Sequence, residues 1–196
     1  MIVYIHGASA THESFNYLRH HLGGIDTCLE YNSDDGFENN LAMMQERLKV
    51  YKKIFFICHS LGGIYALHLA EKFSNRVQGA ITLSTPYGGS KAADYAKYFV
   101  PFSRLMREIG PKSFPMSHIQ SIEIPWPWLN VVSIRGNSPF IVEPNDGVVT
   151  LASQRALADK MDLVDLDVNH YEIVMSPRTV TIIQDRFKKL GIKIND

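Results

Sequence analysis

The chain has 196 residues, with 20 lysines and arginines against 20 aspartates and glutamates, and therefore no formal net charge at pH 7. This length suits one domain, large enough to bury about 70% of its unfolded surface. The balanced charge excludes a strong electrostatic attraction to nucleic acid or to an anionic membrane, so we expect a small or uncharged ligand and no nucleic-acid partner.

The start of the sequence has none of the features of a secretory leader. Met1 opens directly into the apolar run 2–5, without a basic start and a longer apolar stretch. We therefore expect a cytoplasmic protein. No apolar run approaches the roughly 20 residues that span a bilayer, so any membrane contact should be peripheral. Cys28 and Cys58 lie in apolar, strand-like runs and are expected to be buried free thiols.

Short runs of β-branched and aromatic residues alternate with longer segments of helical period. Such alternation is typical of βαβ units around a mainly parallel sheet. The expected strands are 2–5, 25–31, 54–58, 79–83, 130–134 and 163–168. The expected helices are 13–22, 37–51, 61–73, 151–159 and 178–190. Asp35, followed by Glu38, is expected to cap the second helix. The sequence thus predicts a single α/β domain over residues 1–196, with about six mainly parallel strands and helices on both faces.

The third expected strand leads through a tight turn at Ser60 into the third expected helix. A strand, turn and helix in this order form a nucleophile elbow, in which a strained turn raises a serine hydroxyl above the sheet. Ser60 is therefore the expected nucleophile. Gly62 and Gly63 would let helix and strand approach closely. Cys58 stands where the usual Gly-x-Ser-x-Gly pattern has its first glycine, and its small side chain should crowd the turn only mildly.

Two backbone amides near this turn are candidate donors to a substrate oxygen. The amide of Leu61 opens the helix after Ser60 and would face a developing oxyanion. The first strand ends in His6-Gly7, where glycine lets the backbone turn and present the amide of Ala8 as the second donor. His59, next to Ser60, is expected to be packed or hydrogen-bonded away from the reaction.

The stretch 85–128 interrupts the alternation after the fourth expected strand. It contains several prolines and many aromatic residues, and is too irregular for a sheet and too apolar for a disordered linker. We expect it to form a short cap or lid whose residues Tyr87, Phe102 and Trp126 bind substrate. The alternative is that these side chains only pack within the cap.

Asp146 lies in a polar turn after the fifth expected strand. A carboxylate in this place could orient a catalytic base and stabilise the imidazolium that forms. The alternative is turn chemistry, since Asp-Gly is a favoured turn pair. Asp94 is the next candidate acid.

His170 follows the last expected strand. The carboxyl ends of parallel strands are where open α/β sheets bind their ligands, so His170 is the expected base. His118, in the expected cap, is its main rival. The chain order Ser60, Asp146, His170 is the order in which α/β-hydrolases present these groups.

The sequence resembles the lipase and esterase branch of the α/β-hydrolases, particularly small lipase-like and inositol-deacylase-like members. The motifs that carry the resemblance are His6-Gly7, Cys58-His59-Ser60-Leu61-Gly62-Gly63, Thr85-Pro86-Tyr87-Gly88-Gly89-Ser90, Asn145-Asp146-Gly147-Val148-Val149 and His170. They stand in family order from the first strand to near the last helix. The resemblance implies a minimal, six-stranded α/β-hydrolase that begins at what would be the third strand of a full-size relative.

The expected function is hydrolysis of a carboxylic ester through an acyl-enzyme on Ser60, acting on a small or lipid-like substrate. The same groups would support thioesterase, amidase or acyltransferase chemistry. A binding protein that kept the fold without the reaction is the alternative from another class. We expect neither a metal nor an organic cofactor, since the sequence has no glycine-rich phosphate loop and no His/Cys cluster with ligand spacing.

Overall fold

The computed structural model describes residues 1–88, 113–139 and 141–193. Six strands form one sheet in the order β2-β1-β3-β4-β5-β6, and every neighbouring pair is parallel. The strands are β1 (Ile2–Ile5), β2 (Asp26–Cys28), β3 (Ile54–His59), β4 (Val77–Leu83), β5 (Trp128–Ser133) and β6 (Asp162–Leu166). The prediction of six parallel strands is confirmed.

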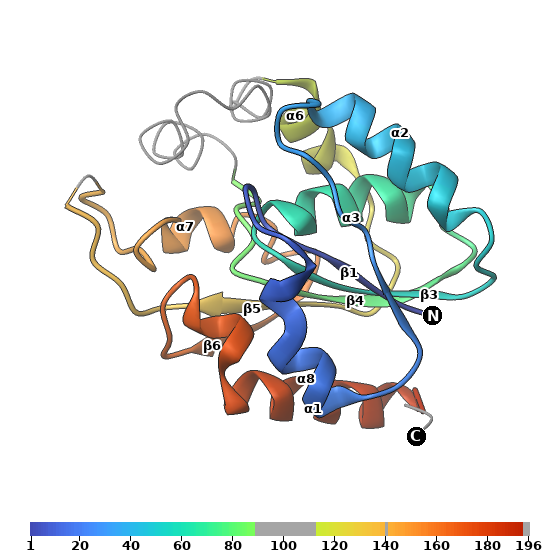
Figure 1. Ribbon diagram of the computed structural model, residues 1–196. Helices are drawn as coiled ribbons and strands as arrows, with labels where there is room; N and C mark the ends of the chain where they lie inside the picture. The colour runs from blue at the N-terminus through green and yellow to red at the C-terminus, as the bar shows by residue number, and fades with distance from the viewer. Residues whose placement is uncertain (89–112, 140, 194–196) are drawn as a thin grey trace.

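Helices cover both faces of this sheet, as predicted (Figure 1). In Figure 1, α2, α3 and α6 lie above the sheet, and α1 and α8 lie below it. The α-helices described are α1 (Asn16–Leu22), α2 (Phe37–Leu48), α3 (Leu61–Lys72), α6 (Phe114–Ser121), α7 (Leu151–Gln154) and α8 (Pro177–Leu190). The short 3-10 helices η1 (His12–Phe15) and η2 (Glu172–Met175) precede α1 and α8.

The buried strands supply a hydrophobic core on each side of the sheet. Side chains alternate between the two faces of a strand. In β1, Val3 and Ile5 belong to the cluster beneath α2 and α3, whereas Ile2 and Tyr4 belong to the cluster that includes residues of α1 and α8. This two-sided burial explains why the strands appear in the sequence as continuous apolar runs.

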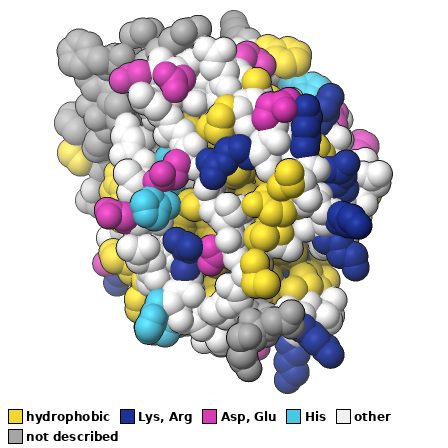
Figure 2. Space-filling model, turned by 45° about the vertical axis from the view of Figure 1, so that its right-hand side comes forward, with side chains coloured by type: hydrophobic (Ala, Val, Ile, Leu, Met, Phe, Trp, Pro, Cys, Tyr) yellow, Lys and Arg dark blue, Asp and Glu magenta, His cyan; other side chains and the backbone are white. Residues whose placement is uncertain are grey.

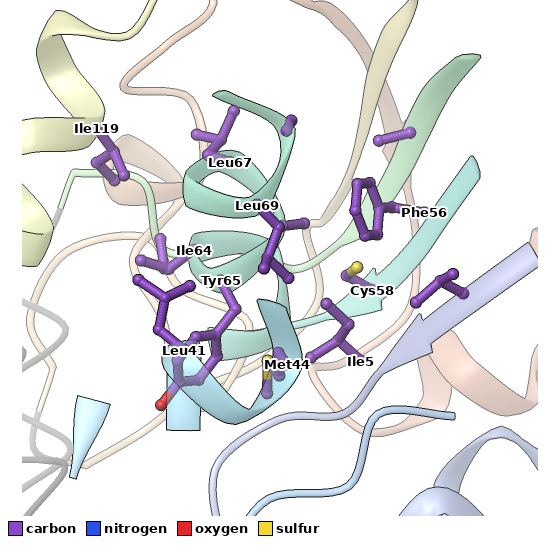
Figure 3. Packing of buried hydrophobic residues seen from close by; sticks show 14 of the residues in the cluster. Ile5, Leu41, Met44, Phe56, Cys58, Ile64, Tyr65, Leu67, Leu69 and Ile119 are labelled. Carbon is purple, nitrogen blue, oxygen red and sulfur yellow. The ribbon is translucent and has the colours of Figure 1, made fainter. Parts of the chain in front are cut away.

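Cys58 packs against α3 as part of the first cluster (Figure 3). Its side chain is fully buried, and burial raises the pKa of its thiol well above the usual value. Cys28 is also a free thiol but is only partly buried, because it lies on the edge strand β2. The expectation of two free thiols is therefore confirmed, and that of full burial holds for Cys58 alone.

The second strand is shorter than the predicted 25–31. β1 ends at Ile5, so the residues that follow Cys28 soon lose the ladder partner that a strand needs. The amide of Leu29 still donates to the Tyr4 carbonyl, 2.8 Å away. The amide of Tyr31 instead donates to a side chain, His6 Nε2, at 3.4 Å.

The second helix begins at Phe37 as predicted and ends at Leu48 rather than at residue 51, but its predicted cap and the end of a later helix are wrong. Asp35 does not cap α2, because Gly36, with φ 83°, occupies the N-cap position and no side chain caps the helix. Asp35 therefore stands one residue too early. The helix predicted at 151–159 ends at Gln154, since the following residues form turns in which the amide of Ala158 donates to the Arg155 carbonyl, 3.0 Å away.

Residues 89–112 of the segment expected to form a cap lie outside the described residues. The described part contains α6, which the sequence did not predict. Met116 and Ile119 of α6 belong to the core cluster that includes α3. His68 of α3 donates from Nε2 to the Pro115 carbonyl, 3.0 Å away. This end of the segment is therefore part of the body of the domain.

The surface carries both signs of charge. Figure 2 shows basic and acidic side chains on one face, with hydrophobic side chains exposed between them. None of the helices in the described ranges is long and apolar enough to cross a bilayer.

Candidate active site

Ser60 lies between β3 and α3, in the turn that the sequence predicts. Its backbone has φ 51° and ψ −122°, a conformation that residues other than glycine rarely adopt. The amide of Ser60 donates to the Leu83 carbonyl over 2.8 Å, and its carbonyl accepts from the Gly63 amide over 3.0 Å. These bonds hold the half-buried serine at the carboxyl edge of the sheet.

Gly62 and Gly63 allow α3 to approach the sheet. A Cβ on Gly62 would lie 2.1 Å from the Ile5 carbonyl oxygen, and one on Gly63 would lie 2.2 Å from Thr85 Oγ1. Both distances are far below van der Waals contact. Small residues are therefore needed after Ser60, as predicted, because the first turn of α3 touches β1 and the segment that follows β4.

The end of β1 lies beside the Ser60 turn, since a Cβ on Gly7 would be 3.1 Å from Ser60 Cβ. The ring of His6 stacks on Tyr31 with centroids 4.4 Å apart, and its Nδ1 donates to the Gly7 carbonyl over 2.8 Å. The Tyr31 hydroxyl donates to the His6 carbonyl over 3.1 Å. Burial lowers the pKa of His6, so its ring acts here as a neutral support for the loop.

The two expected oxyanion donors follow the two residues that lie side by side here: Ala8 follows Gly7, and Leu61 follows Ser60. Leu61 is the first residue of α3, so its amide has no carbonyl partner within the helix. Neither amide donates to another group in the part of the chain that the structure describes.

Asp146 is 1% exposed and lies at the centre of a hydrogen-bond network. The donors to its carboxylate are His170 Nδ1 at 2.8 Å, Ser133 Oγ at 2.5 Å, Gln154 Nε2 at 3.0 Å and the amides of Val148 and Val149 at 3.0 and 2.7 Å. Burial raises the pKa of Asp146, but the opposing effects of His170 and of these hydrogen bonds are together larger. The net pKa lies below its usual value, so Asp146 is a stable anion.

His170 lies between β6 and η2 and is 3% exposed. Its ring donates from Nδ1 to Asp146, so Nε2 is the ring nitrogen that is left to accept a proton. Its amide donates to the Asp146 carbonyl over 3.0 Å. Its carbonyl accepts from His59 Nε2 over 2.8 Å. The structure thus brings Asp146 and His170 into direct contact and joins His170 to the residue before Ser60.

No hydrogen bond joins the Ser60 hydroxyl to His170 among the residues described. Contacts of this kind are often long in an unliganded protein and shorten when substrate binds.

Three residues that contribute to this arrangement were not predicted as functional. Ser133 and Gln154 bind the Asp146 carboxylate, and His59 binds the His170 carbonyl. Ser133 ends β5 and Gln154 lies on the short α7, so neither belongs to a recognisable motif. Only His59 could have been found, from its position next to Ser60.

Of the expected substrate-binding residues, the two that the structure describes, Tyr87 and Trp126, are hydrogen-bonded to other parts of the domain. Tyr87 is fully buried, where its hydroxyl donates to Thr82 Oγ1 over 2.9 Å. Trp126 donates from Nε1 to the Ser74 carbonyl over 2.8 Å. Ser74 follows the far end of the 12-residue α3, about 18 Å from Ser60 at 1.5 Å per residue. Phe102 lies outside the described residues.

His118, the rival candidate for the base, has a different partner. His118 lies on α6 and pairs with Glu71, whose carboxylate is 2.7 Å from Nε2. Asp94 lies outside the described residues. Among the described residues, Asp146 is thus the carboxylate that contacts His170.

A pocket of about 450 Å³ opens beside the end of β1, on the side of α2. Its lining is His6, Ala10, Thr11, Glu30, Tyr31, Asn32, Asp35, Asn39, Asn40 and Met43. His6 lines this pocket and the next residue, Gly7, lies beside Ser60, so the pocket and the Ser60 turn both adjoin the end of β1. A pocket of this volume accommodates a small ligand.

The sequence matches no known protein-family model and no curated protein. Its fold, however, is similar to those of many solved structures. Lipase BlEst2 of Bacillus licheniformis, in its mature form, has a TM-score of 0.76 at 18% identity, covering 96% of this chain and 90% of that one. An alpha/beta superfamily hydrolase from Oenococcus oeni PSU-1 has a TM-score of 0.69 at 14% identity, covering 97% and 92%.

A third similar structure, the Vlm2 thioesterase domain, has a TM-score of 0.61 at 16% identity, covering 95% of this chain and 90% of that one. Each of the three similarities extends over at least 95% of this chain, so it includes the sheet and the helices described above. This chain therefore has the α/β-hydrolase fold.

Proposed function

We propose that this protein is a serine hydrolase that cleaves a carboxylic ester, with Ser60 as nucleophile, His170 as base and Asp146 as the group that orients the base. The observation that carries the proposal is the buried Asp146–His170 pair, joined through His59 to the strained turn at Ser60. A serine hydroxyl is a weak nucleophile unless an adjacent base accepts its proton. The nearby imidazole, with Nε2 left as acceptor, can serve as that base.

In the proposed reaction, Ser60 Oγ attacks the acyl carbon while its proton passes to His170 Nε2. The carbonyl carbon becomes tetrahedral, and its oxyanion accepts hydrogen bonds from the amides of Leu61 and Ala8. The bond to the alcohol oxygen then breaks, and His170 returns the proton to the leaving alcohol. Water attacks the acyl-enzyme by the same route, which releases the acid and restores Ser60.

Asp146 would stabilise the imidazolium in both steps without accepting its proton. Its lowered pKa supports this role, because a carboxylate that stays ionised keeps the His170 ring in one tautomer and orientation. The hydrogen bonds from Ser133 and Gln154 would hold the carboxylate in place.

The substrate we propose is a small or lipid-like ester. Tyr171 and Met175 follow His170 and are 61% and 57% exposed, which provides apolar surface that a lipid-like acyl chain could contact. A contribution of the segment 85–128 to substrate selection is a separate proposal, because most of that segment lies outside the described residues.

The proposal is tested with a fluorophosphonate probe and a series of p-nitrophenyl esters of increasing acyl length. Labelling and turnover should both disappear in Ser60→Ala. Ser9→Ala is the matched control, because Ser9 also has a positive φ, 56°, but an exposed side chain. If Ser60→Ala keeps its labelling and turnover, the nucleophile is wrong.

Thioesters and amides are measured alongside the esters. Thioester cleavage is the second candidate, because the Vlm2 thioesterase domain is among the similar structures. Faster turnover of thioesters than of the matching oxygen esters would replace the ester assignment while leaving the roles of the three residues intact.

A further inference from the structure

His59 occupies a special position between the nucleophile turn and the proposed base. It is covalently joined to Ser60 and, through Nε2, donates a hydrogen bond to the His170 carbonyl, 2.8 Å away. Its side chain is buried, and its ring lies 4.9 Å from that of His170, tilted by 51°. Two histidines that are far apart in the sequence are thus in contact within the core of the site.

The hydrogen bond defines the state of the His59 ring. A carbonyl oxygen can only accept, so Nε2 carries the proton. Burial, with a further contribution from His170, lowers the pKa of His59 to about 3. His59 is therefore neutral at physiological pH, and the proton-free Nδ1 faces Gly7, where a Cβ would lie 3.2 Å away.

This Nδ1 has no hydrogen-bond partner among the described residues. A buried polar atom without a partner lowers stability. An apolar ring of similar size would avoid this cost but would lose the bond from Nε2. The hydrogen bond from Nε2 to the His170 carbonyl is thus the interaction that offsets the cost of burying Nδ1 without a partner.

His170 lies in the loop that joins β6 to η2, here called the His170 loop. Its other hydrogen bonds to described residues do not reach the Ser60 turn. The His170 amide binds Asp146, and the Val168 carbonyl accepts from the Arg135 amide after β5. The amides of Tyr171 and Glu172 both bind the Asn169 side chain, within the loop itself. Among the described residues, the bond from His59 is the one that ties this loop to the β3–α3 turn.

We propose that His59 is a positioning residue that sets the distance between Ser60 and His170. The proposal rests on the proposed function. Asp146 holds the amide and ring of His170, while His59 holds its carbonyl from the residue next to Ser60. The path from nucleophile to base then consists of one peptide link and one hydrogen bond. Catalytic groups must be held to within about 0.5 Å, and a misplacement of about 1 Å can lower the rate about 100-fold.

Three substitutions of His59 test this. His59→Phe keeps the ring but removes the donor. His59→Gln places an amide nitrogen at the reach of Nε2, whereas the shorter side chain of His59→Asn does not reach it. We expect kcat to fall about 10- to 100-fold in the Phe and Asn variants with KM changed less than about threefold. The Gln variant should recover most of kcat.

His68→Phe is the matched control. His68 is also a buried histidine whose Nε2 donates to a backbone carbonyl, that of Pro115 at 3.0 Å, but it lies away from Ser60 on α3. Its loss should lower thermal stability without lowering kcat at temperatures where the protein is folded. A purely structural role for His59 predicts the same result for His59→Phe.

Two outcomes would overturn the proposal: an unchanged kcat in His59→Phe, or equal kcat in the Gln and Asn variants. If His59→Phe does not fold, the comparison of Gln with Asn decides. Ser60→Ala is measured in parallel. A Ser60→Ala variant that keeps turnover rejects the proposed function, whereas an inactive Ser60→Ala beside a fully active His59→Phe rejects the positioning role alone.

Discussion

Asp146 binds His170 twice, through its carboxylate to Nδ1 at 2.8 Å and through its main-chain carbonyl to the His170 amide at 3.0 Å. The two residues are therefore held together at two points, although 24 positions separate them in the chain. Both side chains are buried, so the ionised carboxylate depends on the donors around it rather than on water.

Replacing the Asp146 carboxylate by an amide should remove most of the turnover without unfolding the protein. In the Ser-His-Asp template, this change leaves the geometry but favours the wrong tautomer of the base, and kcat falls about 10⁴-fold. We expect a loss of this order in Asp146→Asn with a far-ultraviolet circular dichroism spectrum like that of the wild type. A variant with near-normal kcat would remove Asp146 from the mechanism.

The donors to Asp146 should matter for stability. Ser133→Ala and Gln154→Leu each remove a hydrogen bond to Asp146 Oδ2. A hydrogen bond to a charged group contributes about 1.5–3 kcal/mol, so the free energy of unfolding in urea should fall by that amount in each variant. Ser121→Ala is the control, because Ser121 is exposed and its hydroxyl bonds only a helix carbonyl. Losses no larger than in the control would contradict the network.

The protein should lose stability on mild acidification. Burial lowers the pKa of His6, His59 and His68 in the folded state, so the unfolded chain binds more protons below its histidine pKa of about 6.5. The stability from neutral His59 is complete above about pH 6.5 and is lost as pH falls toward about 3. The lowered pKa of Asp146 acts in the same direction at lower pH, because protonation of this carboxylate favours unfolding.

Urea unfolding between pH 7.5 and 4 measures this effect. Each such histidine contributes a slope of about 1.4 kcal/mol per pH unit across its window. His59→Gln should flatten the curve between pH 6.5 and 4 by about the contribution of one histidine. An unchanged slope in this variant would mean that folding does not lower the pKa of His59.

Gly62→Ala and Gly63→Ala should differ in whether a second substitution can restore stability. A Cβ on Gly62 meets the β1 backbone, whereas a Cβ on Gly63 meets the Thr85 side chain. Both alanine variants should be destabilised by about 1–3 kcal/mol or more, the usual cost of overpacking. Adding Thr85→Ala should restore part of the stability of Gly63→Ala but none of that of Gly62→Ala. Thermal unfolding of the four single and double variants checks this, and equal rescue would refute it.

Core positions in the segment 85–128 should affect stability rather than specificity. The Tyr87 hydroxyl donates to Thr82 and accepts from Trp128 Nε1 at 3.0 Å, so Tyr87→Phe leaves a buried donor without its partner. We expect a loss of about 1–3 kcal/mol with unchanged acyl-chain preference. Phe102→Ala tests whether the cap selects substrates. If it does, this variant should prefer esters with a different acyl-chain length. A shift of acyl-chain preference in Tyr87→Phe would mean that Tyr87 does contribute to substrate binding.

The order of the strands along the chain, the helices other than α6, and the place of Ser60 could be predicted from the sequence because they depend on local patterns. Apolar runs such as β3 and the helical period of α3 specify their own secondary structure, and Gly62 and Gly63 indicate a close approach. The cap expected from Asp35 failed because Gly36, at positive φ, occupies the N-cap position directly before Phe37.

Contacts between distant residues were decided only by the tertiary structure. Ser133, Gln154 and His59 have no motif of their own, and they meet the Asp146–His170 pair because parallel strands end at one edge of the sheet. The same holds for Tyr87 and Trp126, whose aromatic character suits a pocket and a core equally well. Burying apolar area is favourable wherever it occurs, so composition alone could not place these rings, and the packing of the chain put Tyr87 in the core and Trp126 beyond the far end of α3.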